Sequence, residues 1–216
     1  LTEQWGNPSS AYSFGNEVGE AVDNARAQVA ALINAEPREI IFTSCGTESD
    51  NAALNSALQT QPGKRHIITT VVEHSANIKY GQMLEKRGVE VTWIPVDRAG
   101  QLDVHEVHEA IREDTAMVSV MMANNESGVI FPIEEIVAIC RIKGVPFHTD
   151  AVQTPGKMKL DVKALGVDYL SLSAHKLHAP KGIGCLYVRQ GLPYQPYVLG
   201  GDRKAADAVA RKMSPT

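Results

Sequence analysis

One stretch decides the fold: "YLSLSAHKLHAPKGIG", which runs from Tyr169 to Gly184. An apolar, strand-like run delivers Ser173, His175 and Lys176 together and then breaks into a loop rich in proline and glycine. Desolvating an ammonium group without a partner is costly, so a lysine where a buried strand ends needs a role. The stretch therefore predicts a buried strand with a functional lysine at its carboxyl end.

Short apolar runs alternate with amphipathic stretches along most of the chain on either side of this strand. Strands are predicted at 39–44, 66–72, 89–96, 116–123, 145–151, 167–174 and 182–189. Helices are predicted at 17–34, 48–59, 78–88, 104–113 and 133–144, the last with Gly144 as its C-cap. Near-continuous apolar strands that alternate with helices predict an α/β fold, a mostly parallel sheet sandwiched by helices.

Composition excludes several classes of protein. The chain has 216 residues, 44% of them hydrophobic and 21% charged, and a formal charge of −4, which gives no reason to expect nucleic acid. No apolar run is long enough to span a bilayer, so no membrane partner is expected. The widely spaced Cys45, Cys140 and Cys185 do not form a disulfide framework or a zinc site, which favours a reducing, cytoplasmic location. The segment "HEVH" at 105–108 lacks zincin spacing, so no metal is expected.

Ligands of open α/β sheets collect at the carboxyl ends of the strands, so the polar residues that follow each apolar run matter most. The turn Gly46-Thr47 opens a helix and suits a phosphate, although an ordinary helix start has the same pattern. His74 is either a capping histidine or an imidazole that lies over a flat ligand. Asn125, beside Asn124 and Glu126, either makes a turn or binds a carboxylate or a ring hydroxyl.

Two further strand ends add a carboxylate and an amine. Asp150 closes an apolar run and needs a cation or several donors, and Gln153 follows three residues later. Pyridoxal phosphate (PLP) uses this whole set, because it needs a lysine for its Schiff base and an acidic partner for its pyridine nitrogen. Lys176 is therefore interpreted as the Schiff-base lysine of a PLP site.

The sequence resembles the NifS-like cysteine desulfurases, class-V aminotransferase-type enzymes of PLP fold type I. The matching stretches are "GNPSSAYSFGNE", "IIFTSCGTESDN", "TTVVEHSA", "MMANNESGVIFPIEEI", "FHTDAVQTPGK" and "LSLSAHKLHAPKGIGCLYVR".

The resemblance implies a role for each candidate residue. Lys176 would form the Schiff base, His74 would stack on the ring, and Asp150 would face the pyridine nitrogen. Gln153 would face the ring oxygen, and Asn125 would lie near the substrate carboxylate and the ring oxygen. The phosphate would be held by Thr47, Ser173 and His175, together with the Gly46-Thr47 turn.

The resemblance also implies an activity and partners. The family converts L-cysteine to L-alanine and passes the sulfur on as a persulfide for iron–sulfur cluster assembly. The expected partners are L-cysteine, a second copy of the chain and a sulfur-acceptor or iron–sulfur scaffold protein. Residues 1–16 are expected to be the segment of a truncated family start, 17–190 the PLP-binding large domain, and 191–216 a tail where the family's C-terminal domain begins.

The family's catalytic cysteine loop has no counterpart in this sequence, which predicts weak or absent desulfuration by the chain alone. Cys45 is interpreted as a small residue packed beside the phosphate turn, and Cys140 and Cys185 as core thiols. Two alternatives stay open. One is a PLP enzyme of the selenocysteine lyase or cysteine sulfinate desulfinase type. The other is a non-catalytic module that binds PLP or a partner protein, and an aromatic region around Trp5 and Tyr12 is expected to pack against such a partner.

Overall fold

A seven-stranded sheet with helices on both faces forms the body of the chain, in a computed structural model that describes residues 6–9 and 12–199. The strand order is β1-β7-β6-β5-β4-β2-β3. The strands are β1 (Ile40–Thr43), β2 (His66–Thr70), β3 (Glu90–Ile94), β4 (Thr115–Ser119), β5 (Phe147–Asp150), β6 (Tyr169–Ser173) and β7 (Gly184–Val188).

The sheet is mostly parallel, as predicted. Strands β2 to β6 run parallel to one another, and β7 runs antiparallel to both of its neighbours, β6 and β1. Because β1 and β6 are both antiparallel to β7, they point in the same direction. The carboxyl ends of every strand except β7 therefore lie along one edge of the sheet.

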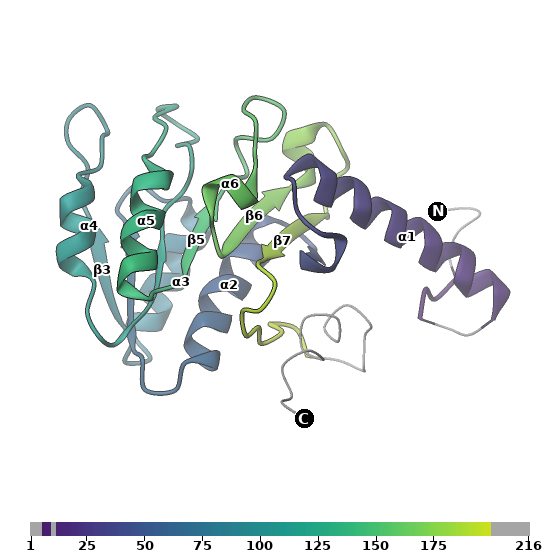
Figure 1. Ribbon diagram of the computed structural model, residues 1–216, viewed down its shortest axis with the longest axis horizontal. Helices are drawn as coiled ribbons and strands as arrows, with labels where there is room; N and C mark the ends of the chain where they lie inside the picture. The colour runs from purple at the N-terminus through teal and green to yellow at the C-terminus, as the bar shows by residue number, and fades with distance from the viewer. Residues whose placement is uncertain (1–5, 10–11, 200–216) are drawn as a thin grey trace.

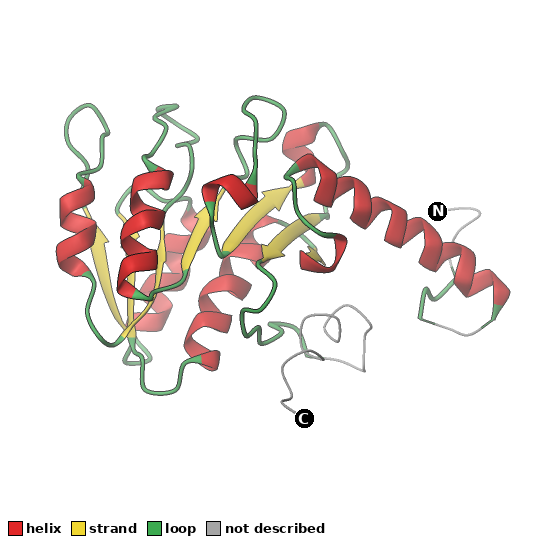
Figure 2. Cartoon of the chain, in the orientation of Figure 1, coloured by secondary structure: helices red, strands yellow, loops and turns green. Residues whose placement is uncertain are grey.

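The helices divide between the two faces of the sheet (Figures 1 and 2). They are α1 (Ser13–Leu32), α2 (Gly46–Thr60), α3 (Ser75–Glu85), α4 (Val104–Ala110), α5 (Ile133–Lys143) and α6 (Val162–Leu165), with short 3₁₀ turns η1 (Pro37–Glu39) and η2 (Ala174–Leu177). One buried hydrophobic cluster joins residues of α2 and α3 to the sheet, and a second joins α1, α4, α5 and α6 to its other face. The predicted helix–sheet–helix layering is confirmed.

Strand residues alternate between the two clusters because successive side chains of a strand point to opposite faces. In β7, Leu186 and Val188 pack with α2, whereas Cys185 and Tyr187 pack on the opposite face. In β6, Tyr169 belongs to the α2 side and Leu170 to the other. This two-sided burial explains why the strands have almost continuous apolar sequences.

Helix boundaries differ modestly from those predicted. Gly144 ends α5 in the left-handed conformation at φ 65°, as expected of a C-cap glycine. α3 begins earlier than predicted because the His74 side chain caps it, accepting from the backbone N–H of Ala76. The short α6 was not predicted, since Asp161, which caps it, is followed by only one turn of helix.

The first helix has a more exposed position than its amphipathic pattern predicts. α1 extends from the body of the chain in Figure 1, and Ala30 near its C-terminal end is buried, whereas Ala21 and Leu32 of its apolar stripe are exposed. Tyr12, which precedes it, is 57% exposed. Trp5 and most of the predicted 191–216 tail lie outside the described residues. None of the described helices has the length and apolar character needed to cross a membrane.

Candidate cofactor site

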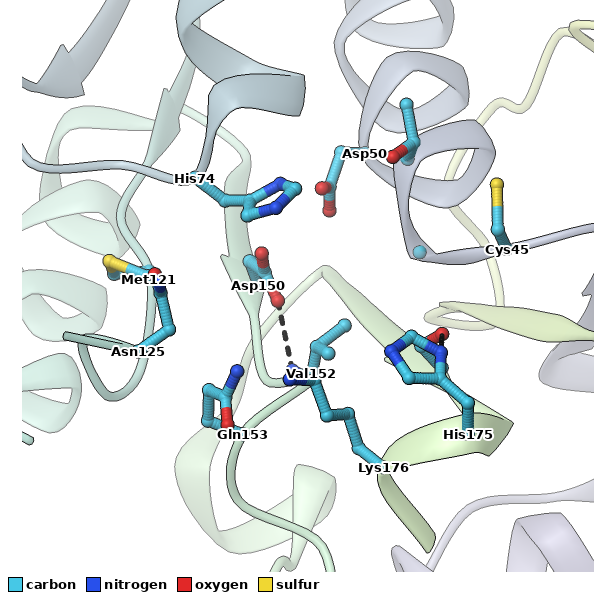
Figure 3. A pocket seen from close by; sticks show the side chains of 13 residues that line it. Cys45, Asp50, His74, Met121, Asn125, Asp150, Val152, Gln153, His175 and Lys176 are labelled. Carbon is cyan, nitrogen blue, oxygen red and sulfur yellow. Dashed lines mark hydrogen bonds between the residues drawn. The ribbon is translucent and has the colours of Figure 1, made fainter. Parts of the chain in front are cut away.

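All of the predicted site residues line one cavity of about 190 Å³ at the carboxyl edge of the sheet (Figure 3). They are Gly46, Thr47, His74, Asn125, Asp150, Gln153, Ser173, His175 and Lys176. They lie at or after the ends of β1, β2, β4, β5 and β6, the strands whose carboxyl ends share this edge. Cys45, Asp50, Met121 and Val152 complete the lining.

One end of the cavity suits an anion. Gly46 and Thr47 form the first turn of the 15-residue helix α2, whose leading N–H groups have no partner within the helix and carry the positive end of its dipole. A Cβ added at Gly46 would lie 3.0 Å from the Val152 Cγ2 atom and 3.5 Å from the Ser173 Cβ, so the glycine keeps this end open. The Ser173 hydroxyl is 2.8 Å from His175 Nδ1, which holds two polar side chains beside the turn.

A buried carboxyl group lies at the floor of the cavity. Asp150 ends β5, is 6% exposed, and accepts a hydrogen bond of 2.9 Å from the backbone N–H of Val152 (Figure 3). Burial raises the pKa of Asp150, while this hydrogen bond and the nearby His74 and Lys176 side chains lower it. Keeping the buried Asp150 ionised therefore costs free energy, and a cationic ligand atom would stabilise its carboxylate.

The two interpretations of His74 are compatible. Its Nδ1 accepts a hydrogen bond of 3.2 Å from Ala76 N–H, so the capping role is confirmed. The exposed imidazole also lines the cavity, with Nε2 left as the proton-bearing nitrogen of the neutral ring. Its stacking on a flat ligand stays a prediction.

The two asparagines after β4 have different roles, one in a turn and the other in the lining of the cavity. Asn124 builds the turn: its side chain donates to Val72 C=O at 2.9 Å and accepts from the backbone N–H groups of Glu126 and Ser127. Asn125 is exposed and lines the cavity instead. Its side-chain amide donates a hydrogen bond of 3.2 Å to the exposed Glu126 carboxylate, so it can meet a ligand by exchanging this surface contact.

The premise that Lys176 is desolvated at the strand end is wrong. Lys176 lies in the 3₁₀ turn η2, past the end of β6, and is exposed. The turn carries the side chain away from the sheet interior to the edge of the cavity, where the ammonium stays in contact with water. Its presence in the cavity, rather than a burial cost, marks it as a candidate functional group.

Two buried acids near the site were not singled out from the sequence. Asp50 lines the cavity from α2, and Glu73 precedes His74. Glu73 accepts hydrogen bonds from the Thr70 hydroxyl, the Asn77 amide and the Met121 backbone N–H, and so ties the end of β2 to the segment after β4. The position of Asp50 has a signal in the sequence, because it lies four residues after Gly46 and hence on the same face of the helix.

The remaining candidates from the sequence lie away from the cavity, except one. Cys140 and Cys185 are buried core thiols, as predicted, at 1% and 4% exposure. Cys45 is half-buried at the start of α2 and belongs to the lining. His105 and His108 lie on α4 and do not line the cavity.

The cavity thus combines an amine, a buried carboxyl group, an imidazole and an anion-binding helix start. Such a set can hold a molecule that carries a phosphate, a basic ring nitrogen and an electrophilic carbon. It can also move a proton, since the Lys176 amine and the Asp150 carboxyl group line the same space.

Comparisons with known proteins identify the family that the chain resembles. Residues 1–213 match the model of the family described as "Aminotransferase class-V". Cysteine desulfurase 2 of Trichormus variabilis is 55% identical over 215 residues, which cover 100% of this chain and 54% of that protein. Cysteine desulfurase NifS of Azotobacter vinelandii is 50% identical over 205 residues, which cover 94% of this chain and 51% of that protein.

A solved structure of a "NifS-like protein" has the same fold. It superposes with a TM-score of 0.90 at 42% sequence identity, and the match covers 94% of this chain and 57% of that chain. The chain spans about half the length of the curated relatives that it matches.

Proposed function

The chain belongs to the class-V aminotransferase family, which uses PLP, and we propose that its cavity is the cofactor site of a cysteine desulfurase. One observation carries the proposal: Lys176, Asp150 and the Gly46–Thr47 helix start line the same cavity. PLP requires an amine for its aldehyde, an acid for its ring nitrogen and donors for its phosphate.

The residues present fit PLP in shape and in charge. A Cβ at Gly46 would project into the anion end and press on the Val152 side chain, so the glycine leaves this end open. Asp150 is a buried acid that forms no ion pair with a lysine or arginine of the described residues. A protonated ring nitrogen would supply the missing cationic partner. Thr47, Ser173 and His175 would hold the phosphate, and Gln153 would meet the ring oxygen.

PLP, when bound, withdraws electrons from the α-carbon of an amino-acid substrate. Lys176 would hold the cofactor through its Nζ atom, and as a free amine it would serve as the base for the α-proton of the substrate. Asp150 would hold a proton at the ring nitrogen, His74 would cover the ring, and Asn125 would meet the substrate carboxylate. L-cysteine is the proposed substrate and L-alanine the product, by analogy with the desulfurases that the chain resembles.

Sulfur removal needs a thiolate that accepts the substrate's sulfur, and the cysteines of this chain are poorly suited to it. Burial raises the pKa of both Cys140 and Cys185 to about 12, so neither thiol ionises near neutral pH. Cys45 is at the side of the cavity opposite Asn125 in Figure 3, next to the anion end. We therefore propose that the 216-residue chain binds PLP and desulfurates cysteine weakly by itself.

The wider role follows from the same analogy. Residues 17–190 would form the PLP-binding domain, and the whole protein would act in the cytoplasm as a homodimer. It would pass sulfur to an acceptor or scaffold protein of iron–sulfur cluster assembly.

The test is an absorption spectrum of the purified chain with added PLP. We expect the visible band of lysine-bound PLP in the wild type, its complete loss in Lys176→Ala, and its retention in Lys181→Ala. Lys181 is a matched control because it is exposed on the loop that follows η2 and does not line the cavity. A folded wild-type chain without the band would overturn the proposal and favour a module that binds only a partner protein.

A second measurement addresses the substrate. The burial of Cys140 and Cys185 favours, as a second candidate, a reaction that needs no protein thiol, such as cleavage of selenocysteine or of cysteine sulfinate. Alanine formation from these two amino acids and from cysteine separates the candidates. Formation from cysteine no faster than with free PLP, together with rapid formation from either of the others, would favour the second candidate.

A further inference from the structure

Three acidic side chains are buried beneath the candidate site: Asp50, Glu73 and Asp150, at 1%, 5% and 6% exposure. Glu73 is held by three hydrogen bonds, and Asp150 accepts from Val152 N–H. Asp50 differs from both. The residue lines the cavity, but its Oδ1 atom is buried and has no hydrogen-bond partner among the described residues.

A buried polar chain lies behind Asp50. His148 on β5 is 0% exposed, with Nδ1 at 2.8 Å from the Ser119 hydroxyl and Nε2 at 2.9 Å from the Ser171 hydroxyl. Asp50 Oδ1 lies 3.6 Å from the same Nε2, too far for a good hydrogen bond. Side chains from β4, β5 and β6 therefore fix the surroundings of an acid that comes from α2.

His148 cannot serve as the cation for Asp50. Burial lowers the pKa of His148 to about 3, so the imidazole is neutral at ordinary pH. A neutral ring has one N–H donor and one acceptor nitrogen, which the two serine hydroxyls satisfy. Asp50 is thus packed against a neutral partner whose hydrogen bonds are already made.

The other titratable groups around Asp50 are both acidic and basic. They are Cys45 at the start of its own helix, Asp150 on β5, Glu73 after β2, and the other titratable residues of the cavity lining, His74, His175 and Lys176. Burial and the neighbouring Asp150 raise the pKa of Asp50 well above its usual range, and the Ser171 hydroxyl opposes this. Two ionised carboxylates at such a site would repel each other in a medium that screens them poorly.

We propose that Asp50 and Asp150 form a carboxyl pair that holds a single proton, with Asp50 as the protonated member and Asp150 as the ionised one. Asp50 is then a positioning residue, because it leaves the negative charge of the site on Asp150 alone. The pair deepens the proposed function and rests on it for one point, that the charge of Asp150 meets the ring nitrogen of PLP. The pair itself exists in the chain without cofactor.

Infrared spectroscopy of the cofactor-free chain tests the pair directly. At pH 7 we expect the carbonyl band of a protonated carboxyl group in the wild type and a loss of intensity in Asp50→Asn. Asp23→Asn is the matched control, since the Asp23 side chain is 83% exposed on α1, and it should retain the full band. Glu73 is present in all three samples, so the same comparison in a Glu73→Gln background separates its contribution from that of Asp50. An unchanged band in Asp50→Asn would overturn the proposal.

Thermal melting gives an independent readout. A carboxyl group whose pKa is raised by folding destabilises the folded state as pH rises above its ordinary pKa, because unfolding then releases a proton. Asparagine has the shape of aspartate and does not titrate. We expect cofactor-free Asp50→Asn to melt at least about 2–4 °C above the wild type at pH 8, with the difference shrinking toward pH 4. A variant that melts below the wild type throughout this range would show that Asp50 is a stabilising charge, against the proposal.

Cofactor titration completes the test. Because Asp50 is neutral, Asp50→Asn should bind PLP within roughly threefold of the wild-type affinity. A loss of roughly tenfold or more would mean that Asp50 is a charged contact, and the pair would be wrong. A wild-type chain that fails to bind PLP would overturn the proposed function instead, while the infrared and melting data still decide the pair.

Discussion

The acidic side chains at the two edges of the sheet differ in their burial and in their ion pairs. At the amino edge, Arg112 pairs with Glu90 at 2.6 Å and with Asp114 at 3.0 Å, and Arg189 pairs with Asp168 at 2.7 Å. These pairs are partly or largely open to water. At the carboxyl edge, the acids Asp50, Glu73 and Asp150 are buried, and no lysine or arginine of the described residues forms an ion pair with them. The acids at the amino edge therefore have arginine partners, whereas the buried acids at the carboxyl edge have no lysine or arginine partner among the described residues.

The two buried histidines sharpen this contrast. His66 on β2 bonds the Thr115 and Thr92 hydroxyls, each at 2.8 Å, just as His148 bonds two serine hydroxyls. Both rings join neighbouring strands and both have a lowered pKa, chiefly because of burial. Only His148 lies beside an acid of the cavity, Asp50. The same arrangement of a histidine between two hydroxyl groups thus only joins strands at His66, whereas at His148 it also adjoins the candidate site.

The largest effect is expected from Asp150→Asn, which removes the charge that a ring nitrogen would need. We expect PLP affinity to fall roughly 10- to 100-fold, the value of a hydrogen bond to a charged group. Asparagine can still accept the Val152 N–H, so the fold should persist. Removing the neighbouring charge should also lower the pKa of Asp50, which repulsion by Asp150 helps to raise. Absorbance titration with PLP measures the first effect and pH-dependent infrared spectra the second.

The control for this prediction is Asp168→Asn, at the opposite edge. Asp168 is half of an ion pair with Arg189 and also accepts from Phe147 N–H, but it does not line the cavity. Its loss should lower stability and leave PLP affinity unchanged. Equal losses of PLP affinity in Asp150→Asn and Asp168→Asn would mean that the difference between the two edges is unrelated to cofactor binding.

The sequence predicted the layers of the fold well, because burial on both faces produces apolar strands that end abruptly in polar residues. Since parallel strands bring their carboxyl ends to one edge, residues as distant as Gly46 and Lys176 could be assigned to one site. Helix faces were harder to predict. Asp50 sits among polar neighbours in "ESDNAAL", so its spacing of four residues from Gly46 is a weak signal, which the rotation of α2 about its axis confirms. The exposure of Lys176 depends on a short 3₁₀ turn, for which local sequence patterns are weak.

A smaller effect is expected from Glu73→Gln, which tests the cost of a buried acid with good hydrogen bonds. Burial raises the pKa of Glu73 to about 8 from its ordinary value of 4.5. Between these values unfolding releases a proton, so Glu73 lowers the free energy of unfolding by up to about 1.4 kcal/mol for each pH unit of increase. Glutamine removes this dependence. The variant should therefore gain stability relative to the wild type as pH rises from 5 to 8.

The hydrogen bonds of Glu73 allow the substitution. Asn77 now donates its amide to Glu73, and its Oδ1 is buried without a partner among the described residues. Turning this amide end for end would let Oδ1 accept from the new glutamine NH₂. Thermal melts at several pH values, with the exposed Glu20→Gln on α1 as control, measure the difference. Parallel curves for wild type and Glu73→Gln would show that Glu73 does not titrate in this range.

The smallest effect is expected at the amino edge, from Arg112→Ala. The Arg112 side chain is 39% exposed and its partners more so, and ion pairs in such positions contribute little because water and salt screen them. We expect the melting temperature to fall by at most about 2–4 °C at low salt, and less in high salt. Arg112 lowers the pKa of Glu90 and of Asp114, so the pairs stabilise the fold above the ordinary pKa of these acids and lose that effect as pH falls. The difference between variant and wild type should therefore close below pH ~4. PLP affinity should stay unchanged, and a variant that loses it would connect the two edges, because charge at one would then control binding at the other.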